Sequence, residues 1–533
     1  MSTTAEITRT DRFLNVIERA GNKLPHPFIL FSILFAVVAV VSTLMALGGA
    51  QVTVPGAKQT TVVRGFFTGE GLAWISTTLV NNFVGFPPLG TVLTILLAVG
   101  LAERTGMLTA VVRQLFGSAP RWALPYAVGF VGVSGSIMSD SAFIVIPPLA
   151  ALVFAAAGRH PVAGLLGGFG AAGAGYSTSL FVTSLDALFA GITTAVTKGL
   201  PNPGTPVTPL SNYFFNAVSA VVLSLVAGFV IARVLEPRLE RLGVPRVPVT
   251  DTGDEAGRHD NPASGSADEA DQDMRAEVTA QERKGLRLAG LTVLLLAAGI
   301  VTTALLPESP LRNDRGGYLP SSPLLGSTVA IVFLVFAVPS LVYGVAVRTV
   351  GSAEDVPRLL VGAVRDFAPF VVLAFILGQF IALFTWTGIG SWLAVKGAQS
   401  LESVGFTGFG AILAFVLLAS VLNLFIVSGS SMWTLLASVF VPLFALLGFE
   451  PAFVQAAFRI GDSATQVMTP LNPYMIVLLG FLRRYEPEAG LGTTMARMVP
   501  FVVPFMLAWT AVLAIFYFTG VPFGPGTGSR IGG

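Results

Sequence analysis

The chain contains repeated apolar stretches that are each long enough to cross a lipid bilayer. A helix needs about 20 consecutive apolar residues to span the hydrocarbon core. The first such stretch, residues 27–48, carries no charged side chain. Across all 533 residues 53% are hydrophobic and only 11% are charged, a balance that a soluble protein of this length could not bury. The chain is therefore predicted to be an all-α polytopic membrane protein.

About nine stretches have the length and composition of transmembrane helices. Two further apolar stretches, near 122–157 and 405–448, are interrupted by Ser-Gly-Ser and proline, so they are predicted to be re-entrant hairpins. The nine predicted spans are residues 27–48, 88–115, 163–198, 212–235, 286–306, 323–348, 369–392, 452–482 and 498–520.

Basic residues predict the orientation, because Lys and Arg are retained on the cytoplasmic side of a membrane. With a cytoplasmic N-terminus, the basic clusters fall on inside loops, provided that both hairpins are re-entrant and open to opposite sides. Residues 1–25 are polar and basic, and no cleavable signal peptide is predicted. The predicted location is the cell (inner) membrane. The predicted outside loops are residues 49–87, 199–211, 307–322 and 393–404.

The same pattern divides the chain into five regions. Residues 236–284 hold no aromatic side chain and few aliphatic ones, so they are predicted to be a disordered cytoplasmic linker. The regions are a cytoplasmic N-terminus (1–26), a first transmembrane half (27–235), the linker (236–284), a second transmembrane half (285–520) and a C-terminal tail (521–533).

The two halves share a weak internal repeat. SGSIM at 134–138 matches SGSSM at 428–432, and GYSTSLFVTSLD at 175–186 matches GDSATQVMTPLN at 461–472. Because the predicted hairpins open to opposite sides, the repeats are inverted across the membrane plane. Inverted repeats in transporters place binding sites near the midplane, where unwound segments expose backbone groups.

Charged side chains within membrane-spanning segments are costly, so each is a candidate functional residue. Arg459 and Asp462 are three apart on one helix face, which fits an ion pair or separate roles toward a substrate carboxylate and a cation or proton. Asp186 has no basic neighbour within a helical turn and either carries a proton or caps a broken half-helix. Asp140 either caps a hairpin helix or binds an ion, and Glu103 is predicted to be interfacial.

Neutral residues extend this candidate site. Ser428–Ser431 offers hydroxyls and backbone amides to an anion, and Asn423 offers an oxygen to a hard cation. Trp433 either stacks on an aromatic substrate or packs structurally. Pro470 and Pro473 are expected to break the eighth span.

The chain resembles the AbgT family of p-aminobenzoyl-glutamate and sulfonamide antimetabolite transporters over most of its length outside the linker. The most specific blocks are SDSAFIVIPPLAALVF, GRHPVAGL, TSLDALFAGIT, NLFIVSGSSMW, QAAFRIGDSATQVMTPLNPY and LRRYEPEAGLGT. At Gln466, Ser179 and Ser184 the chain departs from the usual family residues. The resemblance implies a homodimer with nine helices and two opposed hairpins per protomer. It also implies a site of Asp186, Asn423, Ser430, Trp433, Pro451, Arg459, Asp462 and Pro470.

The expected function is secondary active transport of p-aminobenzoyl-glutamate-like aromatic anions, sulfonamide antimetabolites or both, driven by a proton or sodium gradient. No cofactor is expected apart from a bound Na+, and the net charge of +2 gives no reason to expect a nucleic-acid partner. The alternatives are an ion or solute channel and an intramembrane enzyme that uses Asp186 with Asp462. The expected substrate residues are Asp186, Ser430, Trp433, Pro451, Arg459 and Pro470. The expected cation or proton residues are Asp462, Asp186, Asn423 and Asp140, with Asp462 and Asn423 as ligands for Na+.

Overall fold

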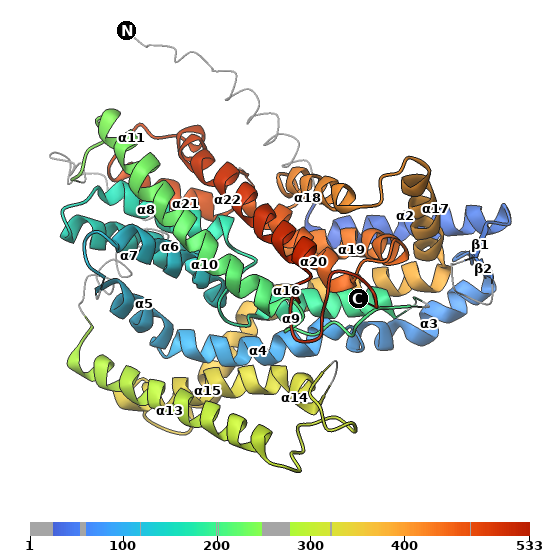
Figure 1. Ribbon diagram of the computed structural model, residues 1–533, viewed down its shortest axis with the longest axis horizontal. Coiled ribbons are helices and arrows are strands. Elements are labelled where there is room, and N and C mark those ends of the chain that lie inside the picture. Colours follow the sequence, from blue (N-terminus) through green and yellow to red (C-terminus); the bar gives the residue numbers. More distant parts are fainter. Residues whose placement is uncertain are drawn as a thin grey trace, which may run out of the picture.

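The structure, a computed structural model, describes residues 25–53, 60–117, 119–198, 200, 202–247, 278–319, 322–469 and 471–532. Regular structure in these residues is almost entirely helical (Figure 1). Nine of the described helical segments are long and apolar enough to cross a membrane, which confirms the all-α membrane class. The one described sheet is an antiparallel pair of β1 (Gln51–Thr53) and β2 (Thr60–Val62).

One group of helices packs around α4 and α16 and is named the α4/α16 bundle. Small residues allow close approach between these helices, as is common in membrane proteins. A Cβ placed on Gly100 of α4 would lie 2.5 Å from that of Ala363 on α16. The bundle consists of α2 (Pro27–Leu47), α3 (Gly69–Val84), α4 (Pro87–Arg104), α13 (Ala280–Leu305), α15 (Thr328–Val347) and α16 (Asp355–Thr387), with the short α14 (Pro323–Gly326) before α15.

The remaining helices follow the same order twice, which confirms the internal repeat. In each half a connecting helix leads into a hairpin, then a broken helix, then a long helix. The first set is α5 (Met107–Gly117), α6 (Leu124–Ser134), α7 (Ala142–Ala156), α8 (Pro161–Ala174), α9 (Ser184–Thr197) and α10 (Tyr213–Phe229). The second set is α17 (Ile389–Ser403), α18 (Phe409–Asn423), α19 (Gly429–Leu446), α20 (Pro451–Ala464), α21 (Tyr474–Arg483) and α22 (Leu491–Thr519).

Each predicted hairpin enters and leaves at one side. At the open end of the first, Arg159 Nη1 donates to the carbonyl oxygen of Arg121 at 3.0 Å. At the open end of the second, Phe409 and Phe449 both contact the ring of Tyr517, with centroid distances of 5.0 and 6.2 Å. Hairpin one is therefore α6–α7, joined by a 3₁₀ turn (Gly135–Ser141), and hairpin two is α18–α19.

The two hairpins point in opposite directions. Helix α10 runs between their open ends. At its start, Phe215 N–H donates to Phe523, which contacts Phe453 just after hairpin two. At its other end, beyond a π-helical turn (Val230–Leu235), Glu236 accepts from Arg159 and from the N–H of His160 just after hairpin one. The inverted repeat predicted from sequence is thus present in the fold.

Two predicted spans are interrupted near their middle. Span 163–198 is split into α8 and α9 by residues 175–183, and span 452–482 into α20 and α21 by residues 465–473, which include a 3₁₀ turn (Gln466–Met468). The nine long segments therefore differ from the nine predicted spans. The broken helices fall short, while Leu124–Ala156 of hairpin one and α19 of hairpin two qualify by length.

Several predicted boundaries also shift. The outside loop 49–87 contains α3, and the loop 393–404 is mostly α17. The linker 236–284 overlaps ordered structure at both ends, because α11 (Glu236–Arg241) buries Leu239 and α13 begins at Ala280. Its centre, residues 248–277, lies outside the described residues, as does most of the N-terminus, 1–24. The C-terminal tail packs onto the body through the buried ring of Phe523.

Candidate functional site

The break of the first broken helix lies against the last turns of α20. Ser177, in the first break, donates its N–H to Ser463 Oγ at 3.0 Å and its hydroxyl to Asp462 Oδ2 at 2.8 Å. Its carbonyl oxygen accepts from Arg459 Nη1 at 2.7 Å. Ser177 therefore connects the first half of the chain to three side chains of α20.

Arg459 and Asp186 form a buried ion pair across the same junction. Arg459 Nη2 lies 2.8 Å from Asp186 Oδ1, and the two side chains are 2% and 5% exposed. The predicted ion pair of Arg459 with Asp462 is therefore wrong for this conformation. A partner from the other half of the chain lies in direct contact and compensates the buried guanidinium.

The sequence suggested that Asp186 is unpaired, but the structure gives this carboxylate several partners. Besides Arg459 it accepts from the N–H and hydroxyl of Thr183, at 2.7 and 2.9 Å, and from Asn216 Nδ2 at 3.0 Å. The bonds with Thr183 cap the first turn of α9, which is the alternative that the sequence left open. Asp186 thus holds the start of α9 and the guanidinium together.

The carboxylate of Asp462 faces the beginning of α19. A Cβ on Gly429, the first residue of this helix, would lie 3.3 Å from Asp462 Oδ2. Ser428 caps the helix by accepting from the N–H of Ser431 at 3.4 Å. The unpaired N–H groups and partial positive charge of a helix N-terminus stabilise a nearby carboxylate. The tip of hairpin two therefore faces the carboxylate of Asp462. The sequence analysis expected this Ser428–Ser431 segment to suit an anion.

Two neutral oxygens near Asp462 have no hydrogen-bond donor among the described residues. Asn423 Nδ2 donates to the backbone carbonyl of Asp462 and to Thr465 Oγ1, which leaves Asn423 Oδ1 without a partner. Gln466 Oε1, one residue beyond Thr465, is also buried and unpartnered. Carboxylate and amide oxygens are ligands of hard cations. Asp462, Asn423 and Gln466 are therefore of the residue types that a hard cation such as Na+ accepts as ligands.

A cavity of about 940 Å³ lies between the hairpin tips and the α4/α16 bundle, and it extends to His26 at the start of α2. It is named the hairpin cavity. Asp140 faces it and accepts from Tyr176 Oη at 3.2 Å, while Glu103 accepts from Ser141 of hairpin one. Glu103 therefore lines the cavity near the end of α4, and its interfacial position stays a prediction. The polar lining includes Glu103, Asp140, Tyr176, Ser430, Gln466 and Tyr474.

Two other predicted substrate residues lie elsewhere. Trp433 is fully buried, donates its Nε1–H to Thr193 Oγ1 at 3.1 Å and packs on Phe458 at 4.6 Å. In this conformation it packs structurally and does not line the hairpin cavity. Pro451 begins α20 at the end where hairpin two opens. Pro470 lies outside the described residues.

Sequence reasoning missed Ser177, Thr183 and Asn216, which hold the charged groups in place. Ser177 could have been found, because the internal repeat matches it with Ser463, to which it is hydrogen-bonded. Asn216 carries no such signal, since it lies on α10 outside the repeated blocks.

A helical membrane protein with two opposed hairpins and two broken helices that cross at buried charges is an inverted-repeat membrane transporter. The chain matches the AbgT putative transporter family over residues 12–531 and belongs to that family. It is 36% identical over 531 residues to the p-aminobenzoyl-glutamate transport protein of Escherichia coli (strain K12), which covers 100% of this chain and 99% of the relative. The resemblance to the AbgT family is thus confirmed. The family and this relative are named for transport, not for an enzyme activity.

Two solved structures share the whole fold. The Alcanivorax borkumensis YdaH transporter superimposes with a TM-score of 0.84 at 32% identity, covering 94% of this chain and 100% of that chain. Neisseria gonorrhoeae MtrF, described with a class of antimetabolite efflux pumps, gives a TM-score of 0.85 at 35% identity over 97% of this chain and 100% of that one.

Proposed function

We propose that this protein is a secondary active transporter of p-aminobenzoyl-glutamate-like aromatic anions and of sulfonamide-type antimetabolites. A proton or sodium gradient drives it, and access alternates around the crossing of the two broken helices. The names of its relatives support this substrate class, because one transports p-aminobenzoyl-glutamate and another belongs with antimetabolite efflux pumps. Its place is the cell membrane, with a cytoplasmic N-terminus and a homodimeric assembly.

The observation that carries the proposal is the buried ion pair of Arg459 with Asp186. A guanidinium can exchange one carboxylate for another through the same planar pair of N–H groups. A substrate carboxylate that takes the place of Asp186 would loosen the bond between α20 and the start of α9. Substrate binding is thereby linked to the arrangement of the two halves.

The coupling ion, Na+ or a proton, binds at Asp462. Asp462, with Asn423 Oδ1 and Gln466 Oε1 close to its helix end, would hold Na+, or Asp462 alone would take a proton. Because Ser177 bonds both Arg459 and Asp462, occupation of one position changes the donors available at the other. This shared serine is the structural basis that we propose for coupling the ion to the substrate.

The test is uptake of labelled p-aminobenzoyl-glutamate into proteoliposomes, with an imposed proton gradient, an imposed sodium gradient and neither. Accumulation that depends on one gradient supports the proposal and identifies the ion. Downhill equilibration without accumulation supports a channel instead. In the same assay Asp462→Asn is expected to abolish gradient-driven accumulation, and accumulation at the wild-type rate would contradict the coupling role of Asp462.

A further inference from the structure

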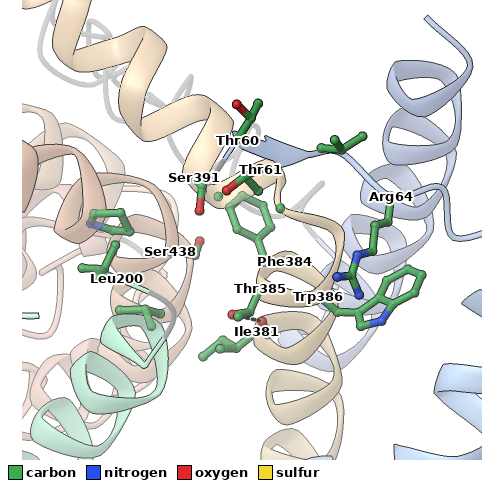
Figure 2. A pocket seen from close by; sticks show the side chains of 15 residues that line it. Thr60, Thr61, Arg64, Leu200, Ile381, Phe384, Thr385, Trp386, Ser391 and Ser438 are labelled. Atoms are coloured by element: carbon green, nitrogen blue, oxygen red, sulfur yellow. Dashed lines mark hydrogen bonds between the residues drawn. The ribbon is translucent and has the colours of Figure 1, made fainter. Parts of the chain in front are cut away.

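A second pocket, of about 420 Å³, lies on the side of the molecule where hairpin two opens. Two of its lining residues, Ser438 and Pro442, belong to the part of α19 that leads to that open end. The opposite wall comes from β2, the end of α16 and the start of α17. It is named the Arg64 pocket after the residue that stands beside β2 (Figure 2).

Arg64 is the only charged side chain among the described residues that line this pocket. Its backbone N–H is fixed by the carbonyl oxygen of Thr387 at 2.9 Å. Its guanidinium carbon lies 5.8 Å from the centre of the Trp386 ring, and Trp386 in turn stacks on Trp74 at 4.9 Å. Among the described residues the guanidinium makes no hydrogen bond and no ion pair, so its donors are free for a ligand.

The rest of the lining supplies aromatic and hydroxyl groups. Figure 2 shows Arg64 and Trp386 side by side at one end, Phe384 near the centre, and Ser391 and Ser438 toward the other end. This order places a cation, then aromatic rings, then neutral hydroxyls along the pocket. A planar molecule with a carboxylate at one end and a polar group at the other matches that order.

The charge of the Arg64 pocket is opposite to that of the hairpin cavity. The hairpin cavity is lined by the carboxylates of Glu103 and Asp140, and its described lining contains neither Lys nor Arg. The Arg64 pocket has a guanidinium, and its described lining contains neither Asp nor Glu. An anion is therefore favoured at the Arg64 pocket.

We infer that the Arg64 pocket is a second ligand site, which binds an aromatic carboxylate. Arg64 pairs with the carboxylate through its planar fork, and the rings of Trp386 and Phe384 line the part of the pocket that takes the ligand ring. The volume lies in the range of about 300–1,000 Å³ that is usual for small-molecule sites. The inference goes beyond the proposed transport function, because binding here needs neither Arg459 nor Asp462.

The position of the site gives it a further property. One wall comes from β2, the end of α16 and the start of α17, and the other comes from α9 of the first broken helix and α19 of hairpin two. A ligand in the pocket therefore bridges the two parts that alternating access would move against each other. Occupation of the site is expected to hold this side of the transporter in the arrangement seen here.

The test uses p-azidobenzoate, a photoreactive aromatic carboxylate, on the purified full-length protein in detergent. After illumination, peptide mapping is expected to find label in segments 60–64 and 381–391, and an excess of p-aminobenzoate should prevent this labelling. Arg64→Gln should weaken labelling there at least about tenfold, since a charge-assisted bond is lost. Arg64→Lys keeps the charge but loses the planar fork and should give an intermediate value.

The matched control is Arg315→Gln, which removes one exposed arginine away from the pocket and should label like the wild type. Label confined to the hairpin tips, or equal label at 381–391 in Arg64→Gln and the wild type, would overturn the inference. Label retained at the Arg64 pocket in Arg459→Ala would support it. That result stands even if the same variant, or the wild type, fails to transport p-aminobenzoyl-glutamate.

Discussion

At the scale of single residues, the centre of the molecule depends on groups that compensate one another. Arg459 and Asp186 are both buried, and each supplies the countercharge of the other. A buried ion pair that loses one partner leaves an uncompensated charge, which typically costs about 3–5 kcal/mol. The pair is therefore expected to respond to mutation as a unit.

The first prediction concerns this pair. Arg459→Gln and Asp186→Asn should each lower the thermal unfolding temperature in detergent strongly, and the double variant should lose less than the sum of the two. Unfolding monitored by light scattering or tryptophan fluorescence measures this directly. Strict additivity of the two effects would show that the ion pair does not hold α20 to α9.

A second residue with a clear expected response is His160, at the turn between α7 and α8. Its ring Nε2 lies 3.2 Å from the carbonyl oxygen of Val244, and its Nδ1 is buried with no partner among the described residues. Burial lowers the pKa of His160 from its ordinary value of 6.5, and Arg246 lowers it further, while the bond to Val244 and the charges of Glu236 and Glu240 oppose the shift.

Because the unfolded imidazole binds a proton at higher pH than the folded one, the free energy of unfolding should fall as the pH decreases through about 6.5. The contribution of neutral His160 to the free energy of unfolding is complete above that pH and is lost as the pH falls below it. His160→Gln retains a donor for Val244 but does not titrate. Melting curves from about pH 8 to about pH 5 should show a shallower loss of stability for the variant; parallel curves would contradict this reading.

The sequence identified the charged groups of the site but not their pairing. Arg459, Asp462 and Asp186 stood out because charge is expensive in a membrane. The spacing of three residues allowed an ion pair of Arg459 with Asp462 as one of two alternatives, whereas the partner in space is Asp186 of the other half. The ion pair of Arg459 with Asp186 joins two helices that are far apart in the sequence. The spacing of residues within one helix cannot predict such a contact.

At the scale of elements, close helix packing rests on glycine faces. Gly461 of α20 approaches hairpin two so closely that a Cβ would lie 2.6 Å from both Ala419 Cβ and the carbonyl oxygen of Val416. In the other half, a Cβ on Gly164 of α8 would lie 2.4 Å from the carbonyl oxygen of Ala150 in hairpin one. Each broken helix thus meets its own hairpin through a glycine.

Gly461→Ala is therefore expected to destabilise the protein by about 1–3 kcal/mol through overpacking. Thermal unfolding measures the effect, and uptake activity should fall with it because hairpin two is displaced from α20. Gly480→Ala in α21 is the matched control, since a Cβ there meets no atom within 4 Å. Equal melting temperatures for the two variants would show that α20 and hairpin two are less tightly packed than described.

Elements with uniform apolar composition could be predicted from sequence, and those with mixed composition could not. The hairpins were predicted within a few residues of their observed bounds because Ser-Gly-Ser interrupts the apolar runs. Helix α3 was assigned to a loop, because it holds Glu70, Asn81 and Asn82. Asn82 is accommodated in the bundle by a hydrogen bond to Gln379 of α16 at 2.9 Å, a contact distant in sequence.

At the scale of the whole molecule, the two halves are joined by a segment with few apolar residues. The helices on either side of it, α11 and α13, are packed by Leu239 and by Gly285 against Tyr343. Deletion of residues 250–275 is therefore expected to leave transport intact. Proteoliposome uptake by the shortened chain at the wild-type rate is the expected result, and loss of uptake with normal membrane insertion would assign the segment a direct role.

The bonds of Ser177 to the other half also bear on how faithfully such a carrier works. A carrier slips when its ion crosses without its substrate, or its substrate without its ion. Here the same serine holds the guanidinium through its carbonyl oxygen and the neighbouring carboxylate through its hydroxyl. Both groups are therefore held by the same residue of the first break. A fixed ratio of ions to substrate molecules is expected to depend on these two bonds of Ser177. Ser177→Ala removes the bond to Asp462 and is the variant in which we expect ion flux without substrate.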